Sequence, residues 1–178
     1  PGDSVGEICH IYNTTASMGY FPANFKEGAM ALLSKENPAS SNPLKYRPIT
    51  LLETVGEIFE KIIRNRLIRF IDENNLNHPN QFGFRKGYGT QSALGILHET
   101  IALSQQDKHN TNIVSRDISK AFDKVWHKGL KYKLIHTTLP SPFVNLLCNF
   151  LDNRKVRIKF QNQISEYFYP SSGVPQGS

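Results

Sequence analysis

The sequence has few cysteines, and the two it has are not spaced to work together. Cys9 and Cys148 form neither a Cys-x-x-Cys pair nor a disulfide framework, which favours a reducing, intracellular setting. The six histidines are scattered without ligand spacing, which argues against zinc. No apolar run has the length of a membrane span, and no signal peptide is visible. We therefore expect neither a secreted disulfide scaffold nor a membrane partner.

The bulk composition is that of a globular, basic protein. The chain has 178 residues, enough for one domain or part of a larger one, with 39% hydrophobic and 20% charged residues. Its net charge of +6 and pI of about 9.4 make a polyanionic partner plausible, although many basic proteins bind no nucleic acid. The chain starts at Pro1 and stops just after a turn-like sequence, so we expect a piece of a longer polypeptide.

The spacing of apolar residues predicts both helices and strands. Helices are expected over residues 3–18, 54–73 and 90–106, from Val125 to before Pro140, and from Ser141 over the next three turns. Strands are expected over 27–34, 113–117, 155–160 and 164–169, the last two as a hairpin. Arg47 precedes Pro48 and must be extended, whereas residues 49–52 fit either a strand or the entry to a helix. This order predicts an α+β fold.

The stretch Ile113-Val-Ser-Arg-Asp-Ile-Ser-Lys-Ala-Phe-Asp123 holds the first candidate site. It begins as a β-branched run and ends as a polar turn, with Asp117 at the change. A carboxylate at the end of a central strand is well placed to hold a metal ion, because hard cations prefer oxygen ligands. Phe122 has the size and flatness to wall off a pocket. The alternatives are that Asp117 is an ordinary strand-end carboxylate and that Phe122 only fills the core.

Two other segments combine features that suit nucleic acid. Gln81-Phe-Gly-Phe-Arg-Lys-Gly-Tyr-Gly-Thr90 mixes glycines, aromatic rings and cations, so its backbone can approach a ligand while rings stack and Arg85 or Lys86 meets phosphate. The same composition also occurs in ordinary hairpins. The 54–73 helix is basic, and its cations form either a solvated face or a face beside nucleic acid.

Four motifs together resemble the reverse transcriptase family. They are Leu44-Lys-Tyr-Arg-Pro-Ile-Thr-Leu-Leu52, Asn80-Gln-Phe-Gly-Phe-Arg85 with Thr90, Asp117-Ile-Ser-Lys-Ala-Phe-Asp123 and Gly173-Val-Pro-Gln-Gly-Ser178, in the family's order and spacing. The wording Ala-Phe-Asp-Lys-Val-Trp-His resembles the non-LTR (LINE-like) retrotransposon branch, including its jockey-type members. The resemblance implies the fingers (residues 1–109) and part of the palm (110–178) of a right-hand polymerase.

The resemblance also implies roles for individual residues. Asp117 matches the first metal-binding, catalytic aspartate, and the backbone carbonyl of Ile118 would be a second ligand for Mg2+. Lys35 and Arg47 match finger cations that grip the incoming dNTP, and Arg47 could instead pair with a carboxylate. Phe122 matches the gate that excludes ribonucleotides, and Gln176 matches a glutamine near the nucleotide and template. Arg85 would contact the template strand.

The implied chemistry is RNA-directed DNA synthesis in retrotransposition. Two Mg2+ ions would activate a DNA primer 3′-hydroxyl on an RNA template and stabilise the leaving pyrophosphate. The family's Tyr/Phe-x-Asp-Asp box is absent from the sequence, so we expect the chain to be inactive in isolation. The alternative is a non-catalytic nucleic-acid-binding remnant of such an element. A nuclear and cytoplasmic location is expected, and the sequence does not determine the oligomeric state.

Overall fold

Contacts divide the chain into two units, and the computed structural model describes residues 4–38 and 41–176. Unit 1 comprises residues 1–67 and 119–178, and unit 2 comprises residues 68–118. The predicted boundary between fingers and palm at residue 109 is a functional division that these contacts do not test, so it stays a prediction. None of the helices in the described ranges is long and apolar enough to cross a bilayer.

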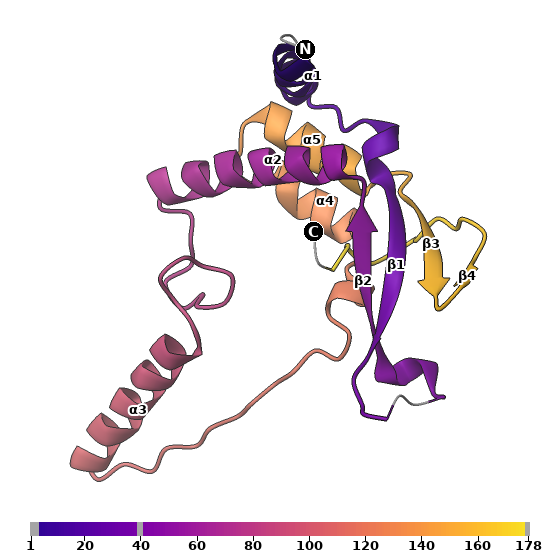
Figure 1. Cartoon of the computed structure of the whole chain (residues 1–178). Helices are drawn as coiled ribbons and strands as arrows, with labels where there is room; N and C mark the ends of the chain where they lie inside the picture. The colour runs from indigo at the N-terminus through magenta and orange to yellow at the C-terminus, as the bar shows by residue number, and fades with distance from the viewer. Residues whose placement is uncertain (1–3, 39–40, 177–178) are drawn as a thin grey trace. The chain divides into compact units, whose positions relative to one another are not determined.

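Unit 1 is built on a mixed four-stranded sheet with the strand order β2-β1-β3-β4 (Figure 1). The strands are β1 (Glu27–Ser34), β2 (Tyr46–Leu52), β3 (Lys155–Phe160) and β4 (Gln163–Ile164). β1 runs antiparallel to β2 and parallel to β3, and β3 runs antiparallel to β4. A mixed sheet combined with helices agrees with the predicted α+β class.

β2 settles the alternative left open for residues 49–52, because it continues as a strand to Leu52. Pro48 is tolerated within it because β2 is an edge strand. The amide of Thr50 points away from β1 and donates to the carbonyl of Gln176. Pro48 lies two residues earlier and faces the same edge, so its missing N–H costs no bond to β1.

Four helices begin and end close to the predicted residues, but the helix expected from Val125 to before Pro140 is shorter, at His127–Ile135. The helices are α1 (Ser4–Ser17), α2 (Thr54–Glu73), α3 (Thr90–Gln106), α4 (His127–Ile135) and α5 (Ser141–Leu151). Gly19, with φ of 64°, ends α1 in a left-handed conformation that suits glycine. The expected start of this helix at Asp3 lies outside the described residues.

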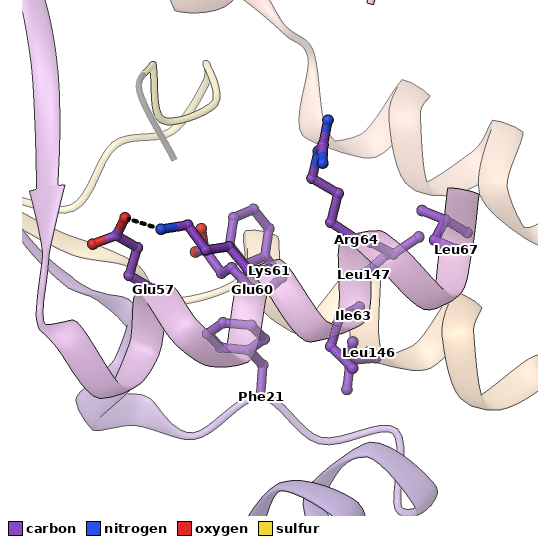
Figure 2. A pocket seen from close by; sticks show the side chains of 10 residues that line it. Phe21, Glu57, Glu60, Lys61, Ile63, Arg64, Leu67, Leu146 and Leu147 are labelled. Carbon is purple, nitrogen blue, oxygen red and sulfur yellow. Dashed lines mark hydrogen bonds and ion pairs between the residues drawn. The ribbon is translucent and has the colours of Figure 1, made fainter. Parts of the chain in front are cut away.

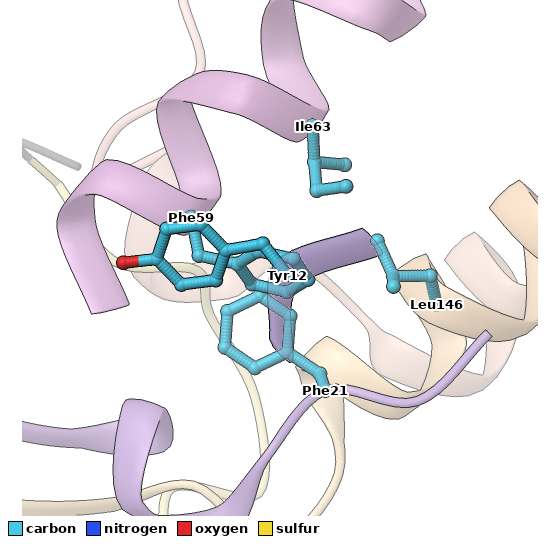
Figure 3. Packing of buried hydrophobic residues seen from close by; sticks show 5 residues of the cluster. All are labelled: Tyr12, Phe21, Phe59, Ile63 and Leu146. Atoms are coloured by element: carbon cyan, nitrogen blue, oxygen red, sulfur yellow. The ribbon is translucent and has the colours of Figure 1, made fainter. Parts of the chain in front are cut away.

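The core of unit 1 is a cluster of aromatic and branched side chains from α1, α2, α5 and the connection after α1, which supplies Phe21 (Figure 3). Phe59 is fully buried, and its ring centroid lies 5.2 Å from that of Tyr12 and 5.3 Å from that of Phe21. Ile63 and Leu146 complete the cluster. The Tyr12 hydroxyl donates to the carbonyl of Val55 at 2.7 Å, which satisfies its polar end.

Two predicted strands differ from the structure. Residues 111–118 form no ladder with any described strand and are exposed throughout. The β-branched run at Ile113 and Val114 has strand propensity, but a strand also needs a partner to satisfy its backbone. The second hairpin strand is shorter than expected, since β4 ends at Ile164 and only a bridge between Val156 and Phe168 follows.

Candidate functional site

The segment from Ser172 to Gln176 binds two parts of unit 1 through its backbone. The amide of Gly173 donates to the carbonyl of Val125 at 2.9 Å, and the amide of Val174 donates to the carbonyl of Phe122 at 2.8 Å. At the far end of the segment, the carbonyl of Gln176 accepts from the Thr50 amide at 2.9 Å. The segment therefore links the turn after Phe122 to the free edge of β2.

Gly173 is the residue that allows this close approach. Its φ is 88°, in the left-handed region that L side chains rarely adopt. A Cβ at this position would lie 3.0 Å from the carbonyl oxygen of Asp123 and 3.1 Å from that of Phe122. The His127 Nε2 lies 2.6 Å from the Gly173 carbonyl oxygen and holds the segment from the other side.

Phe122 and Gln176 are consequently positioned within one unit. Phe122 begins a short 3-10 helix (Phe122–Lys124), and its side chain is 38% exposed. Gln176 is half-buried at the edge of β2. An exposed ring on a hydrogen-bonded turn can serve as a wall for a ligand, because its backbone is held while its face stays accessible.

Of the two cations predicted to grip a nucleotide, one lies on β2 and the other just after β1. Arg47 is exposed on β2, and Lys35 is exposed directly after the end of β1. The Lys35 amide donates to the carbonyl of Lys45 at 2.9 Å, which extends the pairing of the two strands. Among the described residues, no carboxylate forms an ion pair with Arg47, so the alternative that it pairs with a carboxylate gains no support.

A cavity of about 300 Å³ lies beside the Ser172–Pro175 backbone. Sheet residues Met30, Thr50 and Val156 line it, together with His127 and Arg154. Arg154 is only 6% exposed, and its guanidinium carbon lies 4.3 Å from the centre of the Phe150 ring. Burial lowers the pKa of Arg154, and the carboxylate of Glu60, 3.9 Å from Nη1, opposes that shift.

Arg154 and His127 were not recognised as site residues from the sequence. Neither terminal nitrogen of Arg154 has a hydrogen-bond partner within the described ranges. Its partner Glu60 is 94 positions away on α2, and His127 contacts a carbonyl 46 positions away. Local spacing carries no signal for such pairs, so only the folded chain could reveal them.

A second hollow, of about 200 Å³, lies between α2 and α5 (Figure 2). Phe21, Ile63, Leu146 and Leu147 form its apolar wall. The α2 side chains Glu57, Glu60, Lys61 and Arg64 also line it, and Glu57 pairs with Lys61 at 2.8 Å. The charged side chains of the hollow all come from α2, and we assign the hollow no functional role.

Asp117 and Ile118 lie in unit 2, at the end of the exposed extended segment. Ile118 is 72% exposed, and the Asp117 carboxylate is also accessible. The expectation that a central strand would hold Asp117 is wrong for this structure, since residues 111–118 have no strand partner. Within the described residues, no group of three or more histidine, cysteine, aspartate or glutamate side chains could hold a metal ion.

Arg85 lies in the glycine- and aromatic-rich loop of unit 2. Its guanidinium carbon is 4.2 Å from the centre of the Tyr88 ring, and Tyr88 in turn lies 6.1 Å from Phe82. Phe84 is 94% exposed and has a φ of 60°, while Gly87 has a φ of 80°. The loop is thus a tightly turned segment that presents rings and cations at its surface.

Comparisons with known proteins agree with the four motifs. The sequence profile of the family described as reverse transcriptase (RNA-dependent DNA polymerase) matches residues 33–178. The whole chain is 34% identical to a probable RNA-directed DNA polymerase from transposon X-element of Drosophila melanogaster, of which it covers 20%. It is 30% identical over its full length to the RNA-directed DNA polymerase from mobile element jockey of the same species, of which it covers 19%. A type-1 R2 retrotransposable element polyprotein of Nasonia vitripennis is 25% identical over 96% of the chain.

These relatives also bear on the branch within the family. The chain spans 20% of the length of the X-element relative, 19% of the jockey relative and 16% of the R2 relative. Their names agree with the predicted likeness to LINE-like, jockey-type retrotransposon polymerases. The profile match extends over most of the chain and includes all four motifs. The chain therefore belongs to the reverse transcriptase (RNA-dependent DNA polymerase) family.

Proposed function

We propose that this chain forms the fingers and part of the palm of an RNA-directed DNA polymerase that acts in retrotransposition. The observation that carries the proposal is the attachment of the Ser172–Gln176 segment to both the Phe122 turn and β2. That attachment brings the predicted sugar gate, the predicted glutamine and the strand of Arg47 into one unit. RNA template, DNA primer and dNTPs are the proposed partners.

Each proposed contact follows from the chemistry of its side chain. The planar guanidinium of Arg47 suits bidentate contact with a triphosphate, and Lys35 would add a second positive charge. Both would neutralise charge that develops on the phosphates. Phe122 would exclude a 2′-hydroxyl by occupying its space, which discriminates by repulsion. Gln176 would approach the base, and Arg85 the template strand.

The donors proposed for Mg2+ fit its chemistry only in part. The Asp117 carboxylate and the Ile118 carbonyl are hard oxygen ligands, and both residues are accessible. Mg2+ requires six oxygen ligands, so substrate phosphates, water and further carboxylates would have to supply the rest. When bound, the metal would supply a more acidic 3′-hydroxyl and charge stabilisation. We expect no turnover from the chain without a Tyr/Phe-x-Asp-Asp segment.

Primer extension on an RNA template tests this proposal. The chain would be joined to a downstream segment that carries the Asp-Asp box, and Asp117→Asn would be compared with Asp107→Asn. Both substitutions remove one exposed carboxylate from the same unit, but only Asp117 is proposed to hold metal. We expect magnesium-dependent incorporation that is lost in Asp117→Asn and retained in Asp107→Asn. No incorporation by the parent protein, with salt-dependent template binding, would instead favour the inactive remnant.

A further inference from the structure

The peptide unit between Gly173 and Val174 is bonded at both of its polar groups. Its N–H, which belongs to Val174, donates to the carbonyl of Phe122 at 2.8 Å. Its carbonyl oxygen, which belongs to Gly173, lies 2.6 Å from Nε2 of His127. A carbonyl oxygen only accepts, so the His127 Nε2 carries a hydrogen and donates it. One peptide unit therefore connects the His127 side chain to the backbone of the proposed sugar gate.

The planarity of this unit makes its two bonds depend on each other. The peptide bond between Gly173 and Val174 is trans. In a trans unit the C=O and the N–H point in opposite directions and can only rotate together. The group that fixes the direction of the Gly173 carbonyl therefore also fixes the direction of the Val174 N–H. A hydrogen bond to the carbonyl also polarises the unit, which strengthens the bond that its N–H makes.

Glycine at position 173 makes the unit easy to turn over. A peptide unit reorients by rotation about the two backbone bonds that flank it, and Gly173 has no side chain to oppose that rotation. The Gly173 amide is held by the Val125 carbonyl at 2.9 Å, but this amide belongs to the preceding peptide unit. The bond from His127 to the Gly173 carbonyl is therefore the contact that keeps the unit from turning.

The turn that carries the proposed gate depends on support from outside. It is a 3-10 helix of three residues, Phe122–Lys124. Two amides of this turn donate to preceding carbonyls at 3.1 and 3.4 Å, and bonds of the 3-10 type are poorly aligned. The bond from the Val174 amide to the Phe122 carbonyl is shorter, at 2.8 Å. Loss of this bond would leave the gate residue in a short turn held only by its weaker local bonds.

The backbone around His127 suits a fixed donor. His127 is half-buried and is the first residue of α4. Next to it, the Trp126 carbonyl accepts from the Leu130 amide at 2.9 Å. The Trp126 ring packs against Gly129, where a Cβ would overlap it. The start of α4 is therefore held by both a hydrogen bond and packing, and it carries the His127 ring to a defined place.

We propose that His127 is a positioning residue for sugar selection. It holds the Gly173 carbonyl, the held peptide unit directs the Val174 N–H to Phe122, and the Phe122 ring stays in the space of a 2′-hydroxyl. This inference rests on the proposed function, because Phe122 excludes ribonucleotides only in a polymerase. A role of His127 confined to folding would change the overall rate of synthesis and leave the choice between sugars unchanged.

Nucleotide choice by the chain joined to a downstream Asp-Asp segment tests the proposal. The ratio of kcat/KM for dATP to that for ATP would be measured opposite uridine in an RNA template. His127→Ala is expected to lower this ratio by about tenfold, the order of one lost hydrogen bond, chiefly through faster incorporation of ATP. His127→Gln is expected to restore the ratio, because its amide nitrogen can donate to the same carbonyl. An unchanged ratio in His127→Ala would overturn the proposal.

The matched control is His136→Ala, which removes the histidine at the other end of α4. The His136 Nδ1 lies 2.7 Å from the carbonyl oxygen of Tyr132, so it also contacts a backbone carbonyl. That carbonyl belongs to α4 itself, and the ratio in His136→Ala is expected to match that of the parent protein. An equal fall in both alanine variants would overturn the proposal, since it would indicate a general sensitivity to changes in α4.

A double variant tests whether His127 acts through the gate. Phe122→Val removes the ring and is expected to lower the ratio by itself. In that background His127→Ala is expected to lower it no further, because two residues that act through one contact are not additive. If the two effects multiplied instead, His127 would act by another route and the proposal would be overturned.

Amide exchange in the 178-residue chain tests the structural step without polymerase activity. His127→Ala is expected to speed exchange of the Val174 amide about tenfold, and His127→Gln to keep it near the parent rate. The Phe168 amide, bonded to the Val156 carbonyl at 2.9 Å, is the internal control and should not change. Unchanged exchange at Val174 in His127→Ala would overturn the inference.

The outcomes separate this inference from the proposed function. Absence of nucleotide incorporation by the parent protein would reject the proposed function and the inference together. Incorporation that depends on Asp117, with the same ratio in His127→Ala as in the parent, would reject the inference and leave the polymerase function in place.

Discussion

The two units of the chain differ in what holds their functional residues. Unit 1 has a buried aromatic core and a sheet whose edge is bonded to the Ser172–Gln176 segment. In unit 2 none of residues 68–118, all of which the structure describes, is buried. Phe122, Gln176 and Arg47 are therefore positioned by backbone hydrogen bonds and packing. Asp117 and Ile118 are extended and solvated. Motifs of the same family thus lie in segments of very different local stability within one chain.

Amide hydrogen exchange gives the largest expected contrast between the two units. The amides of Ala29 to Ala31 lie in a strand paired on both sides, whereas residues 111–118 have no ladder partner. We expect protection on the order of 10³-fold or more in β1 and almost none in 111–118. Exchange measured by mass spectrometry or NMR checks this. Strong protection of residues 111–118 would mean that the Asp117 segment is paired in solution.

Truncation of Phe59 is expected to have the largest effect on stability. Phe59→Ala removes a fully buried ring from the centre of the core and should lower the free energy of unfolding by about 3–5 kcal/mol. Leu94→Ala on α3 is the control in unit 2, where the side chain is 62% exposed, and should change it by less than about 0.5 kcal/mol. Urea unfolding measures both. Similar losses in the two variants would show that α3 buries its apolar face in solution.

Two glycines with similar backbone angles sharpen the comparison. Gly173→Ala in unit 1 adds a Cβ against the backbone of Asp123, whereas Gly87→Ala in unit 2 meets nothing within 4 Å. Both substitutions cost about 1–2 kcal/mol of local strain, since φ is positive at each. Gly173→Ala should lower the unfolding free energy further, by about 1 kcal/mol or more, because the new contact strains the segment. Equal losses of unfolding free energy in the two variants would show that residues 172–176 can move away from the turn at Phe122 without cost.

The smallest effect is expected at the ion pair of Lys155 and Glu27. The hydrogen bond from the Lys155 side chain to Glu27 raises the pKa of Lys155 above the ordinary 10.5. The contribution to stability is present in full below 10.5 and is lost as the pH rises through the raised pKa. Lys155→Met should lower the free energy of unfolding slightly at neutral pH and should reduce its further decrease at high pH. Lys133→Met, on α4, should leave both unchanged. Urea unfolding at neutral pH and above pH 10.5 distinguishes the two variants. Identical pH profiles for both would show that the pair of Lys155 and Glu27 does not contribute to the pH dependence of stability.

Much of the fold followed from local patterns. The ranges of β1, β3 and α2 were predictable because apolar spacing and turn residues act within a few positions. The strand predicted over 113–117 does not form, because strand formation depends on a partner that the residues themselves do not specify. For the same reason the partner of β3 shortened to Gln163–Ile164.

The sequence by itself determined the family, because four motifs in a fixed order carry side chains that a polymerase requires. It also determined the alternation that makes β3 basic on one face. Only the tertiary structure decided that Gly173 abuts Asp123, that Arg154 is buried beside Glu60, and that His127 contacts the Gly173 carbonyl. Those relations join residues far apart in the chain, and burial, register and backbone contact arise only once the chain is folded.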